Sequence, residues 1–406
     1  MSAQAETEAI LQKTDQYLDQ AVQFFRDIIA IPSYSAREEQ VAHRIRAEMQ
    51  RLGFDKAWFD DYGNVIGQIG TGAHPRLVFD GHIDTVEVTD PDRWDFDPFR
   101  GKVENGVVFG RGASDNKAAP VVQIYGVRVL RDVMGERFPG TVFVLGSVQE
   151  EDCDGLGHRF AVMESIGDVD GVVLGECTNC AIYRGHRGRM ELIVTVRGVS
   201  CHASAPERGD NAVYKASRVI LEIEKLNDNL ADHPFLGKGT IAVAKTEVKT
   251  DSLNCVPYEC KIFIDRRLTW GETKQSAVQE IEQAARRAGV PVEIEIPVYD
   301  RPSWRGKVLE VEKYFPTWML EEEHPMVESA AAAFRNLFGK PPVIDKWTFS
   351  TNGVFTAGLH GVPTIGFGPS EERFAHTMID QCPIEHLRRG IAFYAAFPLF
   401  FSRKDA

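Results

Sequence analysis

The sequence predicts an α/β protein: a larger domain with a mostly parallel sheet, and a smaller α+β domain inserted into it. Its 406 residues exceed the roughly 100–200 residues of an ordinary domain. Strand-like apolar segments alternate with helix-like segments over the first half of the chain, as in a parallel sheet covered by helices. Near Gly188 the pattern changes to longer, alternating strands, which predicts that a second unit begins there.

The larger domain is expected to begin with two helices. Apolar residues recur at helical spacing over residues 7–30. Ser35 and Glu38 have the spacing of a capping box for a second helix that runs to about Leu52. Apolar and often β-branched segments predict strands at residues 64–69, 77–80, 141–148 and 171–174. A further helix is expected at residues 116–134.

The inserted domain is expected to contain four strands and two helices. The predicted strands cover residues 190–196, 239–248, 259–268 and 292–296, and the predicted helices cover residues 211–226 and 273–289. About 110 residues is an ordinary domain size. We therefore expect the inserted domain at residues 188–297 and the larger domain at residues 1–187 and 298–406.

Composition favours a cytoplasmic protein whose main partner is not nucleic acid, and it is compatible with a small substrate. The formal net charge of −13 argues against nucleic acid as a partner, because an acidic chain repels phosphate backbones. No apolar run reaches the roughly 18 residues of a membrane helix, and the polar start lacks the features of an export signal. The seven scattered cysteines are typical of reduced thiols in a cytoplasm.

The first chemical motif is Asp80-Gly-His82-Ile-Asp84, which follows an apolar strand. Open α/β sheets bind ligands where parallel strands end. In an extended segment His82 and Asp84 point to the same side, and a carboxylate beside a histidine orients it as a metal ligand. A solvated turn is the alternative explanation for this motif alone.

Two further acidic motifs follow. Asp115 lies after a glycine-rich stretch at the start of a predicted helix, either as a helix cap or as a metal ligand. Glu150 and Glu151 come directly after the strand at residues 141–148. If that segment is extended, they face opposite ways, so that one binds a metal and the other carries a proton. A solvated acidic loop explains Asp152 and Asp154 better than it explains this pair.

Two more candidates complete a possible metal site. Glu176 ends another apolar strand, and His376 follows a glycine-rich turn late in the chain, where a lone histidine is more often structural. Taken together, two histidines and three or more carboxylates suit zinc, with manganese or cobalt as alternatives. Cys177 and Cys180 lack the second cysteine pair of a structural zinc site and are interpreted as ordinary thiols near the site.

In this order, the motifs resemble those of the dizinc exo-hydrolase family, which includes acetylornithine deacetylase, succinyl-diaminopimelate desuccinylase, aminoacylase and carboxypeptidase G-type enzymes. The resemblance covers essentially the whole chain. It implies two divalent metal ions, one held by His82 and Glu176, the other by Glu151 and His376, with Asp115 between them. It also implies that Asp84 orients His82 and that Glu150 is the general base.

The inserted domain resembles the lid of that family. The segment from Gly198 to Ala212 matches the motif of a lid histidine, His202, which in relatives reaches across a dimer to the developing oxyanion. Asn254 and one of the adjacent residues Arg266 and Arg267 match lid groups that grip the substrate. Strand alternation lets only one arginine face the cleft, and the spacing favours Arg267. The resemblance thus implies a homodimer formed through the lid.

Several stretches, among them residues 149–155, 201–211, 265–272 and 345–353, resemble a narrower branch of hydrolases linked to selenium metabolism gene clusters. The chain departs from the wider family pattern at Asn352, where many members have aspartate, and at Gln381, where many have glutamate. Neither residue is an expected metal ligand, so the departures bear on substrate preference and loop packing.

The resemblance implies a metal-dependent amidohydrolase. In the wider clan, glutamate at position 176 goes with deacylases and carboxypeptidases, which favours cleavage beside a free carboxylate or removal of an N-acyl group. The expected substrate is a small N-acyl amino acid. A dipeptidase or a ureido-amidohydrolase on the same site is the first alternative. A non-catalytic, metal-binding relative is the second.

Overall fold

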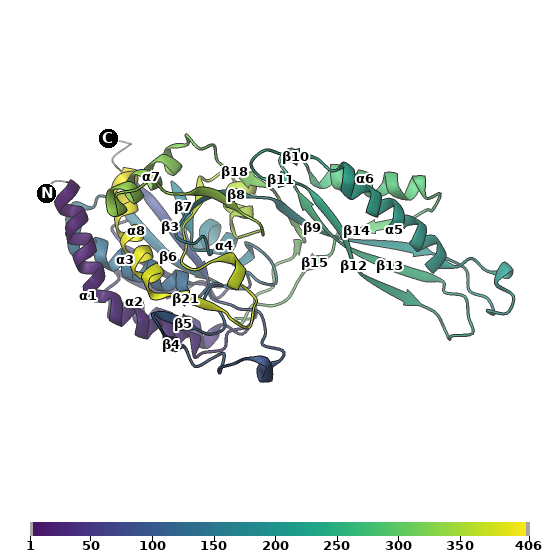
Figure 1. Ribbon diagram of the computed structural model, residues 1–406, viewed down its shortest axis with the longest axis horizontal. Helices are drawn as coiled ribbons and strands as arrows, with labels where there is room; N and C mark the ends of the chain where they lie inside the picture. The colour runs from purple at the N-terminus through teal and green to yellow at the C-terminus, as the bar shows by residue number, and fades with distance from the viewer. Residues whose placement is uncertain (1–2, 403–406) are drawn as a thin grey trace.

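The computed structural model describes residues 3–402 and has two lobes joined end to end. The larger lobe contains both ends of the chain, and the smaller one extends away from it (Figure 1). Residues 1–2 and 403–406 of the expected larger domain lie outside the described part. Between residues 3 and 402, no helix has the length and apolar character needed to cross a membrane.

A nine-stranded sheet forms the centre of the larger lobe, in the order β1-β2-β6-β3-β7-β20-β8-β18, with β19 also paired to β8. The four central strands β6, β3, β7 and β20 are parallel. These strands and their neighbours are β1 (Lys56–Phe59), β2 (Val65–Ile69), β3 (Arg76–His82), β6 (Thr141–Ser147), β7 (Gly171–Leu174), β8 (Ile182–His186), β18 (Trp318–Met319), β19 (Ile344–Trp347) and β20 (Thr364–Gly366). The predicted α/β class is confirmed.

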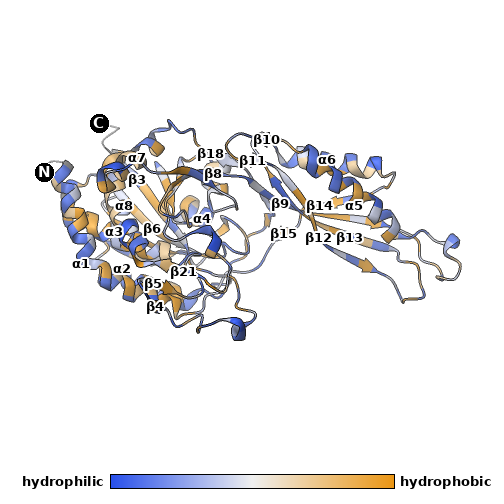
Figure 2. Ribbon diagram, in the orientation of Figure 1, coloured by the Kyte–Doolittle hydropathy of each residue, from blue (hydrophilic) through white to orange (hydrophobic). Residues whose placement is uncertain are grey.

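Apolar packing covers both faces of this sheet, as Figure 2 shows by its orange central strands. Leu77 and Phe79 of β3 belong to the main core, whereas Val78 between them belongs to a second core that contains Trp347. Alternation along a strand produces this division. The larger lobe's helices are α1 (Ala3–Ile29), α2 (Glu39–Arg51), α3 (Ala118–Met134), α4 (Leu156–Phe160), α7 (Pro325–Phe338) and α8 (Ile384–Ser402).

The capping box expected before α2 is wrong. Glu38 occupies the N-cap position and makes no side-chain cap. Instead, Ser35 Oγ donates to Asp84 Oδ2 at 2.7 Å, and Glu38 Oε1 accepts from the backbone N–H of Gln149 at 3.0 Å. Both side chains are buried, so tertiary partners near the strand ends replace the local cap.

The smaller lobe, called the lid below, is a five-stranded sheet with two helices on one face (Figure 1). Its elements are β9 (Gly188–Arg197), α5 (Ala212–Asn229), β12 (Thr240–Lys249), β13 (Glu259–Leu268), α6 (Lys274–Arg287), β14 (Glu293–Glu295) and β17 (Tyr314–Phe315). The fifth strand, β17, lies outside the range expected for this domain. It is only two residues long, which is too short for a periodic signal.

Short elements connect and cover the two lobes. Small sheets are formed by β4 (Lys102–Glu104), β5 (Val107–Phe109) and β21 (Gln381–Pro383), by β10 (Asp232–His233) and β11 (Gly237–Lys238), and by β15 (Val298–Tyr299) and β16 (Val311–Glu312). Single helical turns are η1 (Pro91–Arg93), η2 (Gly135–Arg137), η3 (Ala161–Ile166), η4 (Pro206–Arg208), η5 (Val354–Leu359) and η6 (Glu372–Phe374).

Candidate active site

The candidate ligands lie where parallel strands end. His82 is the last residue of β3, and Glu176 follows the end of β7 by two residues. Glu150 follows the end of the neighbouring strand β6, which pairs in register with β3 so that His82 lies opposite Ser147. Because parallel strands end at one edge of the sheet, residues nearly 100 positions apart in the chain converge there.

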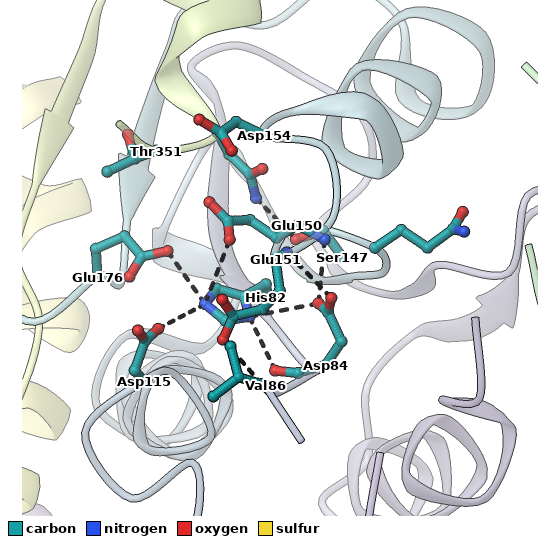
Figure 3. Close-up of polar contacts among 12 residues, drawn as sticks. His82, Asp84, Val86, Asp115, Ser147, Glu150, Glu151, Asp154, Glu176 and Thr351 are labelled. Atoms are coloured by element: carbon teal, nitrogen blue, oxygen red, sulfur yellow. Dashed lines mark hydrogen bonds and ion pairs between the residues drawn. The ribbon is translucent and has the colours of Figure 1, made fainter. Parts of the chain in front are cut away.

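Asp115 lies between the two histidines. Its Oδ1 is 2.8 Å from Nε2 of His82, and its Oδ2 is 3.2 Å from Nε2 of His376. Glu176 Oε1 lies 3.4 Å from the first histidine, and Glu151 Oε2 lies 3.0 Å from the second. Figure 3 shows Asp115, Glu150 and Glu176 converging on His82. Asp115 is therefore not a helix cap, and α3 begins three residues later.

Asp84 holds the two glutamates in place. Its Oδ1 and Oδ2 accept hydrogen bonds from the backbone N–H groups of Glu150 and Glu151, each at 3.1 Å. Its Oδ1 also lies 3.4 Å from His82 Nδ1. The glutamates therefore occupy a turn, preceded by Gln149 with φ +58°. The expectation of an extended segment with the two side chains on opposite sides is wrong.

Asp380 fastens the loop that carries Asp115. Its carboxylate accepts from the backbone N–H groups of Gly112 and Ser114, at 2.8 and 2.7 Å, and pairs with Arg111 at 3.2 Å. It is fully buried. The segment that supplies His376 is thereby tied to the segment that supplies Asp115.

The cluster is electrostatically unusual. Burial raises the pKa of Glu150 well above its ordinary value, with His82 opposing and Glu176 adding to the effect. Burial also raises the pKa of Glu176, whose Oε2 has no hydrogen-bond partner among residues 3–402. Hydrogen bonds to Asp115 and Glu151 raise the pKa of His376 to about 10. Several acids crowded together at low exposure need positive charge to ionise together.

Divalent cations fit this need and this donor set. Two groups of side chains have ligand atoms close enough to share an ion, His82 with Asp115 and Glu151, and His82 with Glu150 and Glu176. Imidazole nitrogen and carboxylate oxygen are ligands that zinc and related ions accept. Oε2 of Glu176, which has no hydrogen-bond partner within residues 3–402, is a further possible metal ligand in this cluster.

A cavity of about 290 Å³ opens beside the cluster. It is lined by Asp115, Glu150, Glu151, Asp154, Glu176, Arg189, Arg267, Phe349, Ser350, Ala375 and His376. Sequence reasoning missed Arg189, Phe349, Ser350 and Ala375, and interpreted Asp154 as a solvated loop residue. Asp154 is buried, pairs with Arg189 at 3.0 Å and accepts a hydrogen bond from Ser350. Arg189 could have been found from strand alternation, because it lies opposite Arg267 on the neighbouring strand.

Comparison with known proteins identifies the family. Residues 78–399 match the sequence profile of Peptidase family M20/M25/M40. The chain belongs to the M20/M25/M40 peptidase family. It is 46% identical over 391 residues to the uncharacterized protein YgeY of Escherichia coli K12, covering 96% of each chain. It is 26% identical over 388 residues to succinyl-diaminopimelate desuccinylase of Phenylobacterium zucineum, covering 93% of this chain and 97% of the relative.

A solved M20-family structure has the same fold. The YXEP protein of Bacillus subtilis, described as a dinuclear metal-binding peptidase, superposes with a TM-score of 0.69 at 15% identity, covering 95% of this chain and 98% of the other. The arrangement of helices around a mostly parallel sheet is therefore that of the M20 fold.

The two adjacent arginines of this M20 chain have different surroundings. Arg267 lines the cavity. Arg266 is fully buried on the helix side of the sheet, where it pairs with Glu272 and with Glu280, the latter at 3.0 Å. Successive residues of β13 point to opposite faces of the lid sheet.

The structure does not bring His202 or Asn254 into the cavity of their own chain. They lie beside each other, where the backbone N–H of Ala203 donates to Asn254 O at 2.7 Å, and both are exposed. Their loops follow the far ends of β9 and β12. The cavity lies at the near end of β9, whose ten residues span roughly 30 Å at about 3.3 Å per residue.

The two departures from the family pattern also lie outside the cavity. Asn352 is buried beneath the site, where its Nδ2 donates to Asp80 Oδ2 at 2.7 Å and its Oδ1 accepts from the N–H of Gly155 at 2.7 Å. Gln381 lies in β21, paired with Phe109. Cys177 and Cys180 are buried thiols, and burial raises the pKa of both.

Proposed function

We propose that this M20 protein is a dinuclear metal-dependent amidohydrolase that acts on a small N-acyl amino acid or a related compound. The observation that carries the proposal is the position of Asp115 between His82 and His376, with a glutamate beside each histidine. This arrangement supplies two sets of ligands that share one carboxylate. A single structural ion would need only one such set.

Each ion would have its own ligands. His82 and Glu176 would hold one, Glu151 and His376 the other, and Asp115 would contact both. When bound, zinc, or manganese or cobalt in its place, supplies Lewis acidity that polarises the scissile carbonyl and acidifies the attacking water. The M20-family neighbour described as dinuclear supports two ions rather than one.

Glu150 is the proposed general base. It lines the cavity and belongs to the group with His82 and Glu176 that could share an ion. Its carboxylate lies farther from His82, at 3.9 Å, than those of Asp115 and Glu176 do, so we assign it to the reacting water rather than to an ion. It takes the proton of the water and passes it to the departing amine, a role worth about 10²–10⁴-fold in rate. Asp84 acts through the backbone N–H groups that fix the glutamate's position.

The lid supplies the proposed substrate contacts. Arg267 would bind the substrate's carboxylate in the cavity of its own chain. His202 and Asn254 would enter the cavity of a second copy, where the histidine would stabilise the developing oxyanion, which is worth about 3 kcal/mol in comparable sites. Their distance from their own cavity supports a homodimer. So do the exposed edge strand β12 and Leu253, which is 99% exposed beside Asn254.

The relatives support the proposed substrate class. Succinyl-diaminopimelate desuccinylase is among them, which favours removal of an N-acyl group. A solved structure of similar fold is described as that of human carnosine dipeptidase 1, which keeps a dipeptidase as the first alternative. A ureido-amidohydrolase and a non-catalytic metal-binding relative are the others. We place the protein in the cytoplasm and in the selenium-linked branch of the family.

Metal removal tests the proposal. Purified protein is expected to contain two divalent ions per chain by elemental analysis. Hydrolysis of a panel of N-acetyl amino acids, N-carbamoyl amino acids and dipeptides should be lost on chelation, because the Lewis acidity that would polarise the carbonyl and acidify the water is removed with the ions. Adding zinc, manganese or cobalt should restore it.

The panel also separates the alternatives. Preferred turnover of dipeptides or carbamoyl compounds would replace the N-acyl substrate class and keep the mechanism. Protein that binds no metal and hydrolyses no member of the panel would overturn the enzymatic proposal in favour of the non-catalytic relative.

A further inference from the structure

The lid presents a pair of arginines to the cavity. Arg189 of β9 and Arg267 of β13 are direct partners in the register of the two strands, and both line the cavity. They lie on the helix-free face of the lid sheet, because Met190 and Arg266, the residues beside them in the chain, point toward the helices. Like charges directly opposite each other destabilise a sheet, so this placement has a cost unless neighbouring acids or a bound anion offset the charge.

Neighbouring acids hold the two arginines without using all of their donors. Asp265 accepts from Nε and Nη2 of Arg267, at 2.7 and 3.0 Å. Among the described residues, Arg189 donates one hydrogen bond, from Nη2 to Asp154, and its buried Nε has no partner. A guanidinium has five N–H donors in a fixed fork, so both side chains keep donors for a ligand.

The guanidinium of Arg189 is held in one orientation. Its Cζ lies 4.8 Å from the centre of the Phe315 ring. Its partner Asp154 lies on the larger lobe, where it accepts a further hydrogen bond from Ser350 of the same lobe. A planar, oriented guanidinium suits two-point binding of a carboxylate better than a mobile lysine would.

We propose that Arg189 is a second carboxylate-binding residue, and that the substrate's free carboxylate is bound between Arg189 and Arg267. The inference rests on the proposed function, and it narrows the substrate to a compound with a carboxylate close to the scissile amide. The small volume of the cavity, about 290 Å³, suits a substrate of amino acid size. Arg189 thereby acts as a specificity-determining residue.

The test compares two substrates that differ only in this carboxylate. Values of kcat/KM are measured for N-acetyl-L-alanine and N-acetyl-L-alaninamide, or for the same pair with the side chain that the panel favours. The wild type is expected to prefer the acid. Arg189→Met should lower kcat/KM for the acid by about 10- to 100-fold, the usual effect of losing a charged hydrogen bond. It should change the value for the amide less than about threefold.

Two further variants exclude a structural explanation. Arg189→Lys keeps the charge and should retain part of the preference for the acid. Arg187→Met removes the same charge two residues away. Arg187 donates to the backbone of Lys238 and does not line the cavity, so this variant should keep the full preference. If Arg189 only braced the two lobes through Asp154, Arg189→Met would lower kcat/KM for the acid and for the amide by the same factor, and the proposal would be wrong.

Binding without turnover separates this inference from the proposed function. In the Glu150→Gln protein, calorimetry should show that N-acetyl-L-alanine binds more tightly than the amide, and that adding Arg189→Met removes the difference. If the Glu150→Gln protein with intact Arg189 bound the acid and the amide equally tightly, the inference would be overturned. Failure of the proposed function would appear differently, as no hydrolysis of any compound by the metal-loaded wild type.

Discussion

Glu150 and Glu151 are neighbours with different partners, and this difference predicts different effects of mutation. Glu151 pairs with His376, whereas the one ion pair of the Glu150 side chain within residues 3–402 is with His82, at 3.9 Å. Glu150→Gln should lower kcat by about 10²–10⁴-fold, because the amide cannot accept the water's proton. Both metal ions should remain bound. Steady-state kinetics with elemental analysis of the same sample measures both.

Asp152→Asn is a matched control for that variant. It removes a carboxylate two residues away that pairs with Arg301 and does not line the cavity, so kcat should be close to that of the wild type. A Glu150→Gln protein with full activity would exclude Glu150 as the general base. If the Glu150→Gln protein lost its metal ions, Glu150 would instead be identified as a metal ligand.

Asn352 predicts an effect on stability. Its Nδ2 donates to the buried carboxylate of Asp80, and Asn352→Asp would replace this donor by a second acid. The free energy of unfolding should fall by about 2 kcal/mol, the usual cost of losing a hydrogen bond to a buried charged group. Urea denaturation measures it. Asn105→Asp, the same change at an exposed turn, should have little effect, and equal stability of both variants would contradict the assignment.

At the residue scale, the sequence predicted the ligands that follow strands better than their surroundings. His82 and Glu176 were predictable because apolar strands end beside them. Asp154 and Ser350 were not, because their partners are far away in the chain, as the 196-residue separation of these two shows. His376 could be assigned as a metal ligand only through the family resemblance, since a lone histidine late in the chain does not distinguish a ligand from a structural residue.

At the element scale, β13 predicts opposite effects for adjacent arginines. Arg266→Met should lower the stability of the lid by about 3 kcal/mol, because two partly buried glutamate partners lose their buried counter-charge. Arg267→Met should leave stability nearly unchanged and raise KM, because Arg267 faces the cavity. Denaturant unfolding and steady-state kinetics of both proteins provide the comparison. Reversed effects would mean that β13 has the opposite orientation.

Element positions were predictable where periodicity was long, and local details were not. The strand at residues 259–268 coincides with β13, because ten alternating residues give a strong signal. The capping box at Ser35 failed because Asp84 and the Gln149 backbone compete for those side chains. Such competition comes from tertiary structure, which a local motif does not contain.

At the scale of the whole molecule, the distance of His202 from its own cavity predicts complementation. Proteins with His202→Ala and with Glu150→Gln should each be nearly inactive. In a mixed dimer one cavity combines an intact Glu150 with the intact histidine of the other subunit. After co-expression, mixed dimers purified with two different tags should have roughly half of the wild-type activity, because one of their two cavities is complete. No recovery in isolated mixed dimers would contradict exchange of histidines between subunits.

The α/β class of the molecule was predictable because alternation of strands and helices leaves few possible arrangements. How far the lid extends was not predictable, because no local pattern reports the distance between the end of β9 and the cavity. The contribution of β17 to the lid sheet was hidden for a similar reason, since its two residues join a strand more than 120 positions earlier.

The bond between Arg111 and Asp380 joins residues 269 positions apart, and this has a consequence for the order of events during synthesis. At about 5–20 residues per second, a ribosome adds Asp380 roughly 13 to 54 s after Arg111. The growing chain therefore carries His82 and Asp115 for about that time, and Glu176 for roughly 10 to 41 s, without the segment that fastens the loop of Asp115. A nascent chain arrested before residue 376 should capture zinc weakly or not at all, and loading of the complete site belongs to the last stage of folding.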